Sequence, residues 1–157
     1  MPLETVDHFP MTEFACKSYT APDGYHPAVP YPDEWVADRL KPLKRLLEKI
    51  RLACGSHAVE VRCGYRTEAY NLELRRRGLQ GERRATGVAL ASHHTEGRAA
   101  DISIYGIEPL VVLQTILDQH AAGHMPELGG VGYYRSLGFT HIDTYRLASG
   151  VLRKWNG

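Results

Sequence analysis

A chain of 157 residues is long enough for one domain that buries most of its apolar surface, and its 43% hydrophobic and 24% charged residues are ordinary for a soluble globular protein. The formal net charge of +1 excludes a bulk electrostatic attraction to nucleic acid or to a membrane surface. No segment approaches the ~20 apolar residues of a membrane span. We expect a single domain over residues 1–157, a monomer that has neither nucleic acid nor a membrane as partner.

The first half of the chain has mainly helical patterns. The expected elements are a short helix capped by Thr12, an irregular Pro-, Gly- and Tyr-rich arm over 19–32, a helix over 33–53, a strand over 57–63, and a helix over 67–77 that stops at Gly78. Pro42 removes one backbone donor from the helical segment 33–53, so a kink or two abutting helices are expected there.

The second half has mainly strand patterns. The expected elements are strands over 99–105, 130–134 and 139–145, and a helix over 109–121 with Pro109 in its first turn. A short turn through residues 136–138 joins the last two strands. Strands and helices are segregated along the chain, which favours an α+β fold with a small, mainly antiparallel sheet and flanking helices.

The amino terminus and the cysteines bear on where the chain acts. Residues 1–9 carry acidic residues and no apolar segment of the length that export needs, so the sequence predicts a cytoplasmic chain, or one released by another route, unless a signal has been trimmed. Cys16, Cys54 and Cys63 lack metal-ligand spacing such as C-x-x-C, and an odd number cannot all pair. We expect buried thiols, with one disulfide and a free thiol as the alternative.

Arginines gather in the middle of the chain, at Arg75, Arg76, Arg77, Arg83 and Arg84. A solvated helix end followed by a loop explains them without a ligand. The alternative is a patch that faces an anionic polymer, and a nucleic-acid binder is one form of it. An affinity for DNA that falls steeply with salt would distinguish the two.

The segment S-H-H-T-E-G-R-A-A-D at residues 92–101 carries the most chemical information. His94 and Asp101 lie seven positions apart with Gly97 between them, which indicates a loop that leads into a strand. Imidazole nitrogen and carboxylate oxygen are usual zinc donors. From spacing alone, an ordinary hydrogen-bonded pair beside the core explains these two residues as well.

The triplet H-I-D at residues 141–143 is the best source of a third ligand. Residues two apart on a strand project to the same side, so His141 and Asp143 would face one site. Three protein ligands leave a fourth position open, which is typical of a catalytic rather than a structural zinc.

Three segments, in order along the chain, resemble the zinc D-Ala-D-Ala carboxypeptidase family. Ser92, His94, Gly97, Ala99 and Asp101 match its pattern S-x-H-x-x-G-x-A-x-D; residues 64–71 resemble its S-G-Y-R-S…Y-N segment, and residues 129–143 its ending G-G-x-G-x-Y…F-x-H-x-D. Its tail is matched by Arg153 and Trp155. The family includes vancomycin-resistance dipeptidases and phage L-Ala-D-Glu endopeptidases and shares its fold with the hedgehog signalling domain. The resemblance covers about residues 8–156.

This resemblance implies one zinc ion on His94, Asp101 and His141, and a peptidase that cuts a bond in the stem peptide of bacterial peptidoglycan. Arg66 stands where the family binds a substrate carboxylate, for which a guanidinium is suited; a surface salt bridge is the alternative. The resemblance also implies that Ser92 hydrogen-bonds substrate, unless it only shapes its loop. Delivery by a phage or prophage route would fit a chain that lacks a signal peptide.

Two tyrosines and two departures from the family pattern need comment. Tyr133 is a candidate for substrate binding, although packing is the simpler role for it and for Tyr134. Cys63 replaces a serine that many relatives have, and His93 stands at a variable position from which it could exchange roles with His94.

The general base is the main gap. Several branches of the family have a glutamate three residues before the last zinc histidine, where this chain has Gly138. Asp143 is the candidate replacement, and its alternative role is to accept a hydrogen bond that orients His141. Glu96 and Glu127 are further candidates. The missing glutamate also supports a rival interpretation, a non-catalytic, zinc-containing module that binds cell wall or protein.

Overall fold

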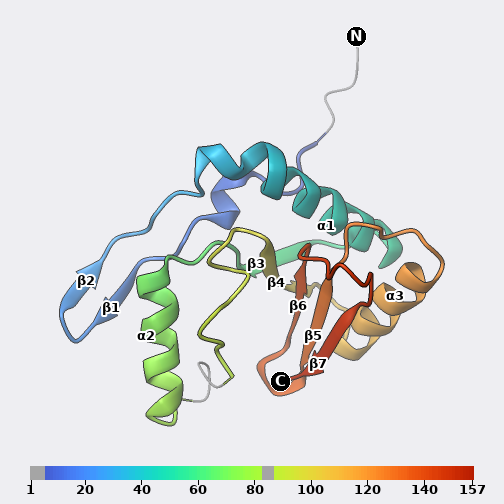
Figure 1. The fold of residues 1–157 in the computed structure, drawn as a ribbon. Coiled ribbons are helices and arrows are strands. Elements are labelled where there is room, and N and C mark those ends of the chain that lie inside the picture. The colour runs from blue at the N-terminus through green and yellow to red at the C-terminus, as the bar shows by residue number, and fades with distance from the viewer. Residues whose placement is uncertain (1–5, 83–86) are drawn as a thin grey trace.

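The computed structural model describes residues 6–82 and 87–157. A five-stranded sheet forms its centre, in the order β3 (Val59–Cys63), β4 (Ala99–Ile104), β6 (Phe139–Asp143), β5 (Gly130–Tyr134) and β7 (Arg153–Asn156) (Figure 1). All neighbouring strands are antiparallel except β5 and β7. The α+β fold with a mainly antiparallel sheet is therefore confirmed.

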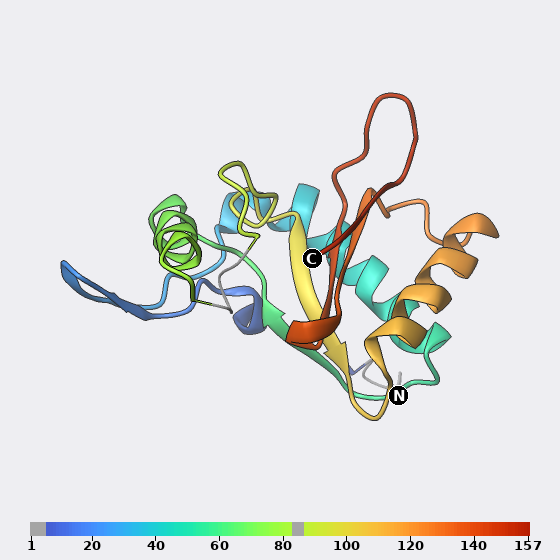
Figure 2. The same ribbon diagram turned by 90° about the horizontal axis from the view of Figure 1, so that it is seen from below.

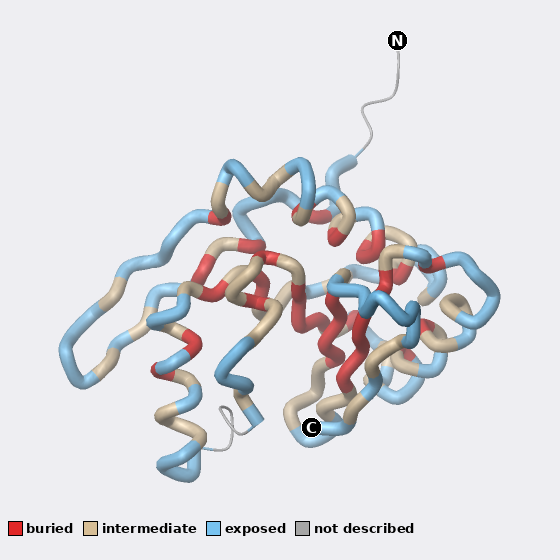
Figure 3. Tube along the Cα trace, viewed as in Figure 1, coloured by how far each residue is buried: buried red, intermediate tan, exposed pale blue. Residues whose placement is uncertain are grey.

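Helices α1 (Lys41–Ala53) and α3 (Pro109–Ala121) pack on each other and on the sheet. The buried side chains of α1 recur at helical spacing and meet Val112 and Ile116 of α3. Each fully buried Leu or Ile contributes about 1.5–3 kcal/mol. Figure 3 shows this buried layer between the helices and the strands. Its members include Leu43, Leu46, Leu47, Ile50, Ile102, Val131 and Ile142.

The segment before α1 agrees with the expectation of abutting helical segments. A 3-10 turn (Asp33–Trp35) and a π-helical turn (Val36–Leu40) precede α1, and Pro42 lies in the first turn of α1, next to the junction of the two segments. Helix α2 (Glu68–Leu79) begins as expected, because the hydroxyl of its N-cap Thr67 accepts from the Tyr70 N–H at 3.1 Å, but it continues one residue past Gly78.

Two expectations in the first half of the chain were wrong, and one strand near the carboxyl terminus was missed. Residues 19–32 are not wholly irregular, since β1 (Tyr19–Ala21) and β2 (Gly24–His26) form a hairpin that lies beside α2 (Figures 1 and 2). The short helix Met11–Phe14 is a 3-10 turn with Pro10, not Thr12, at its N-cap. Strand β7 was not expected at all. It has no strong pattern of its own and exists because β5 pairs with it.

A bulge in β3 decides which side of the sheet Cys63 faces. Val61 pairs with Ile102, but Cys63, two residues on, pairs with Asp101, only one residue from Ile102. One extra residue in β3 reverses the alternation of side chains. Cys63 consequently lies on the face of Asp101, opposite the packed core.

Candidate active site

One face of the sheet collects the polar residues that the sequence analysis singled out. Successive side chains on a strand project to opposite sides, so alternate residues share a face. Asp101 on β4 lies opposite His141 on β6, which lies opposite Gly132 on β5, which in turn pairs with Trp155 on β7. On the same face, two residues further along, Gly130 on β5 pairs with Asp143 on β6 and with Arg153 on β7.

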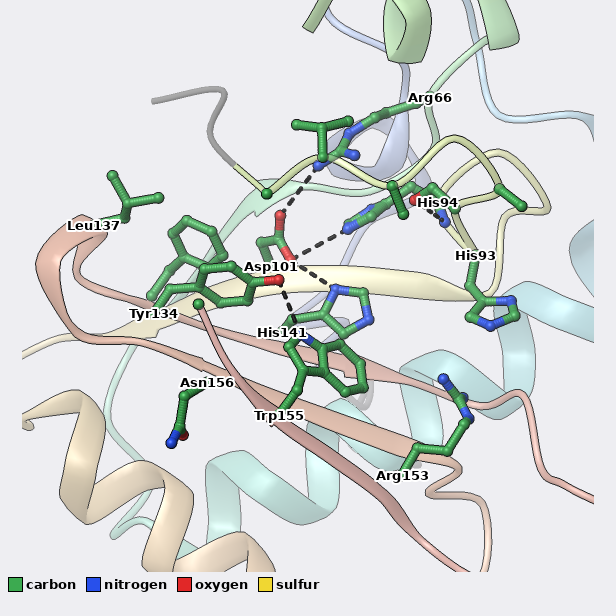
Figure 4. Close-up of a pocket in the computed structure, with 17 residues that line it drawn as sticks. Arg66, His93, His94, Asp101, Tyr134, Leu137, His141, Arg153, Trp155 and Asn156 are labelled. Atoms are coloured by element: carbon green, nitrogen blue, oxygen red, sulfur yellow. Dashed lines mark hydrogen bonds and ion pairs between the residues drawn. The ribbon is translucent and has the colours of Figure 1, made fainter. Parts of the chain in front are cut away.

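Asp101 is the centre of this face. Its Oδ1 lies 3.2 Å from Nε2 of His94 and 3.0 Å from Nδ1 of His141, and the two imidazole rings are 5.0 Å apart (Figure 4). All three residues are buried. Residues separated by up to 47 positions in the sequence thus converge on one carboxylate oxygen, as the sequence analysis expected.

Each of the two histidines is held by an acceptor on its far side. Nδ1 of His94 donates to the Gly64 carbonyl at 2.7 Å, and Nε2 of His141 to Oδ2 of Asp143 at 3.0 Å. A carbonyl or carboxylate partner requires the proton on that nitrogen, so the other nitrogen turns a lone pair towards Asp101 in the neutral ring. This tautomer is the one that a metal ligand needs.

The loop that carries His94 is fixed from outside. Tyr31 donates to the Gly97 carbonyl at 2.6 Å, and Arg39 donates to the Glu96 carbonyl at 2.8 Å. Gly97 has φ +68°, and a Cβ there would meet the Tyr31 hydroxyl at 2.6 Å. Only glycine combines this backbone conformation with this close approach, which explains its place between His94 and Asp101.

The charges of Asp101 and of the histidines shift one another's pKa values. Burial and Arg66 both disfavour a charged His94, but Asp101 and Cys63 outweigh them and raise the pKa of His94 to about 9. Burial raises the pKa of Asp101, and the two histidines more than reverse this, so the pKa lies well below its usual range. The two opposite pKa shifts both favour the ion pair of Asp101 with His94.

The donor set fits a zinc ion. With bonds of about 2.0–2.1 Å to nitrogen, tetrahedral ligand atoms lie roughly 3.3 Å apart. The two nitrogen-to-oxygen separations at Asp101 are close to this value. Two lone pairs that face a carboxylate repel it unless a cation, a proton or a metal, lies between them. His94 and Asp101 could therefore share a divalent ion with His141, whereas the compact group of ligand atoms in the structure is Cys63, His94 and Asp101.

Cys63 is a fourth potential ligand that the sequence analysis read only as a buried thiol. Cys63, His94 and Asp101 each offer a ligand atom, all within 4.8 Å of one another. The sulfur accepts a hydrogen bond from Nε of Arg66 at 3.2 Å. Cys16, Cys54 and Cys63 are all free, as expected, but only Cys16 is buried as a whole residue.

Arg66 holds the site together from the loop before α2. Its side chain donates to Cys63, to Oδ1 of Asn71 at 3.2 Å and to Oδ2 of Asp101 at 3.4 Å. The residue is only 9% exposed. Its place is therefore an internal one, and the surface salt bridge considered as the alternative is wrong.

Asp143 has both carboxylate oxygens occupied. Oδ2 accepts from His141, and Oδ1 accepts from the Tyr145 N–H at 3.0 Å and from Nη2 of Arg153. The residue is fully buried, and the pKa of its carboxyl is lowered because His141 and Arg153 outweigh the effect of burial. These contacts favour the role of orienting His141 over that of a general base.

A cavity of about 410 Å³ opens over this centre. Ser92 lies in its wall and accepts from the His94 N–H at 3.2 Å, which leaves the hydroxyl proton free to donate. Tyr133 is not among the lining residues, and this correction follows from strand alternation: its neighbour Tyr134 shares the face of Gly132 and lines the cavity instead. The Tyr134 hydroxyl accepts from Trp155 at 2.9 Å.

The remaining candidates lie elsewhere or are occupied. Glu96 pairs with His93 at 3.2 Å, and His93, which lines the cavity, stacks on Tyr145. Glu127 pairs with Lys49 at 2.7 Å, away from the cavity.

The arginine cluster is partly neutralised. Arg76 and Arg77 both bind Glu73, which favours the solvated helix end. Two further members of the cluster, at positions 83 and 84, lie outside the described residues.

An α+β sheet that carries two histidines and an aspartate at the floor of a cavity is the arrangement expected from the resemblance to the zinc D-Ala-D-Ala carboxypeptidase and hedgehog class. The family model of peptidoglycan L,D-endopeptidase MepK matches residues 34–155. The chain belongs to this family.

Individual relatives support the assignment. The chain is 35% identical over 99 residues to the probable peptidoglycan L,D-endopeptidase MepK of Haemophilus influenzae, and 38% identical over 97 residues to the peptidoglycan L,D-endopeptidase MepK of Escherichia coli K12. The matches cover 63% and 62% of this chain and 43% of each relative, so the chain spans less than half the length of these relatives. No solved structure matches significantly. Among residues 6–82 and 87–157, no helix has the length and apolarity to cross a membrane.

Proposed function

We propose that this chain is a zinc-dependent peptidase that hydrolyses a peptide bond in the stem peptide of peptidoglycan, with one zinc on His94, Asp101 and His141. The observation that carries this proposal is the convergence of both imidazoles on Oδ1 of Asp101, each with its far nitrogen held by an acceptor. Membership of the MepK family supports the substrate class.

Zinc in such a site polarises the scissile carbonyl and lowers the pKa of a water to about 7. The chain's own residues supply the geometry. Asp143 keeps the proton of His141 on Nε2, and Gly64 keeps that of His94 on Nδ1. Arg66 fixes the second oxygen of Asp101, and the free hydroxyl proton of Ser92 can donate to a substrate carbonyl at the cavity wall.

The names of the relatives favour an endopeptidase over a D-Ala-D-Ala carboxypeptidase. Both are called L,D-endopeptidases, enzymes that cut within a peptide rather than at its end. We extend that activity to this chain.

The chain would work as a monomer, and size-exclusion chromatography with light scattering tests this. Its route to the wall, by phage or prophage machinery, is tested by locating the tagged chain in cell fractions.

The test is incubation of the zinc-loaded chain with purified muropeptides, followed by mass spectrometry. New products that each retain one half of a cross-linked peptide are expected, and release of free D-Ala would indicate the carboxypeptidase instead. Intact muropeptides after prolonged incubation, with one zinc per chain bound, would contradict the peptidase.

The rival is a zinc-containing binding module without catalysis. Gly138 stands where a base is expected, and Asp143 has no free carboxylate oxygen. Cys63 close to the ligands would also allow a closed, structural site. Tight muropeptide binding without cleavage is the result that would favour this module.

A further inference from the structure

The cavity contains a second arginine that the proposed function leaves without a role. Arg153 comes from β7, and Figure 4 shows it across the cavity from Arg66, with Asp101 and His141 between the two. The register of β7 on β5 sets this position, because Arg153 pairs with Gly130 and Trp155 with Gly132. Gly130 and Gly132 have no side chains, and this leaves room for Arg153 and Trp155.

The two arginines differ in what their donors bind. Arg66 uses all three of its nitrogens on Cys63, Asn71 and Asp101, and its side chain is 11% exposed. Arg153 binds the protein through Nη2 alone, which donates to Asp143 and, at 2.7 Å, to the Tyr145 carbonyl. Within the described part of the chain, its Nε is buried without a partner and no acceptor meets its Nη1. Its side chain is 23% exposed.

The surroundings of Arg153 hold the guanidinium in place. The rings of Tyr145 and Trp155 lie 5.4 and 5.9 Å from it, and Nη2 is fixed by Asp143. A guanidinium that is already ordered loses less conformational entropy when it binds a ligand. Nη1 carries two N–H groups that can donate charge-assisted hydrogen bonds to a carboxylate.

The charge of the cavity also favours an anionic ligand. Asp101 and Asp143 are balanced by Arg66 and Arg153, so a divalent cation at the centre leaves the cavity positive. The ion pair of Asp143 with Arg153 offsets the repulsion between that carboxylate and an anionic ligand.

We propose that Arg153 binds a free carboxylate of the acidic peptide substrate, on the His141 and Trp155 side of the cavity, and so selects peptides that carry a free carboxyl over amidated ones. The family resemblance implied this role for Arg66, which the structure shows occupied by internal contacts. The role of Arg153 rests on the proposed function, because that function supplies the acidic peptide.

The test compares two muropeptides that differ only in amidation of their carboxyl groups. Zinc-loaded wild type is expected to have a kcat/KM about 10- to 100-fold higher on the free acid, mainly through KM, as for a hydrogen bond to a charged group. Arg153→Gln should lose this preference and approach the wild-type value for the amide. Arg146→Gln is the matched control, since Arg146 is exposed and, among the described residues, donates to the Pro126 carbonyl alone. This variant should keep the preference.

Two outcomes overturn the role of Arg153. If Arg153→Gln loses the same fraction of activity on both peptides, the arginine acts only through Asp143. If the variant keeps the preference for the free acid, another group binds the carboxylate. If wild type hydrolyses neither peptide, the proposed function fails. Calorimetric titration of the same two peptides into the zinc-loaded wild type and Arg153→Gln then tests the role of Arg153. Tighter binding of the free acid by wild type but not by Arg153→Gln supports it, and equal binding by both contradicts it.

Discussion

Nδ1 of His141 and Oδ1 of Asp101 lie 3.0 Å apart on directly paired residues of two antiparallel strands. The sheet itself therefore sets this separation, because the two backbones are hydrogen-bonded in register. His94 is different: it reaches Asp101 from a loop that Tyr31 and Arg39 hold in place. The site combines one residue pair fixed by the sheet with one histidine fixed by loop packing.

The adjacent histidines His93 and His94 give a matched pair of variants. His94→Ala removes an imidazole that points to Asp101, so zinc uptake and hydrolysis should both be lost. His93→Ala removes a ring that stacks on Tyr145 and pairs with Glu96, and zinc stoichiometry should stay at the wild-type value. Metal analysis after dialysis checks both. If His93→Ala loses zinc and His94→Ala retains it, His93 rather than His94 binds the metal.

Asp143→Asn separates the two roles considered for this residue. An acceptor that orients a zinc histidine affects metal affinity, so the variant should bind zinc about 10- to 100-fold more weakly. Competition with a chromophoric chelator measures this affinity. Unchanged zinc affinity together with lost turnover would instead place Asp143 in proton transfer.

Gly132→Ala should disturb the wall of the cavity. A Cβ at this position would lie 2.5 Å from Nε1 of Trp155, which is itself fixed by the Tyr134 hydroxyl. Displacing the indole is expected to cost about 1–3 kcal/mol of the free energy of unfolding. Denaturant unfolding followed by tryptophan fluorescence measures the loss. Equal stability of Gly132→Ala and wild type would show that Trp155 moves freely.

Glu73 predicts a pH dependence of stability on α2. The hydrogen bond from Arg76, and then that from Arg77, lower the pKa of Glu73 to about 2 from its ordinary 4.5. A carboxyl with a lowered folded-state pKa stabilises the fold above its unfolded pKa, and the stabilisation disappears as the pH falls from about 4.5 to 2. Wild type should therefore be more stable than Glu73→Gln at pH 6, and the difference should vanish by pH 2. A difference independent of pH would rule out the ion pairs as its source.

The sequence predicted the helices and the central strands because their apolar residues repeat with a clear period. It did not predict β7, since Arg153–Asn156 becomes a strand only through pairing with β5. The resemblance to the carboxypeptidase family placed His94, Asp101 and His141 together, and the structure brings both histidines into contact with Asp101.

The placement of two residues at the site depends on the pairing register of neighbouring strands, which the local sequence does not determine. Tyr134 rather than Tyr133 lines the cavity because Gly132 pairs with His141. Cys63 faces Asp101 because of a bulge in β3, and a regular strand would have turned it to the core. In both cases the partner strand decides which face a side chain occupies.

The ligand set is the central claim, and X-ray absorption at the zinc edge tests it most directly. One zinc per chain, with nitrogen and oxygen neighbours only at about 2.0–2.1 Å, is the predicted result for His94, Asp101, His141 and solvent. A zinc–sulfur path at about 2.3 Å that disappears in Cys63→Ser would contradict it, because Cys63 would then be a ligand and the site would be closed.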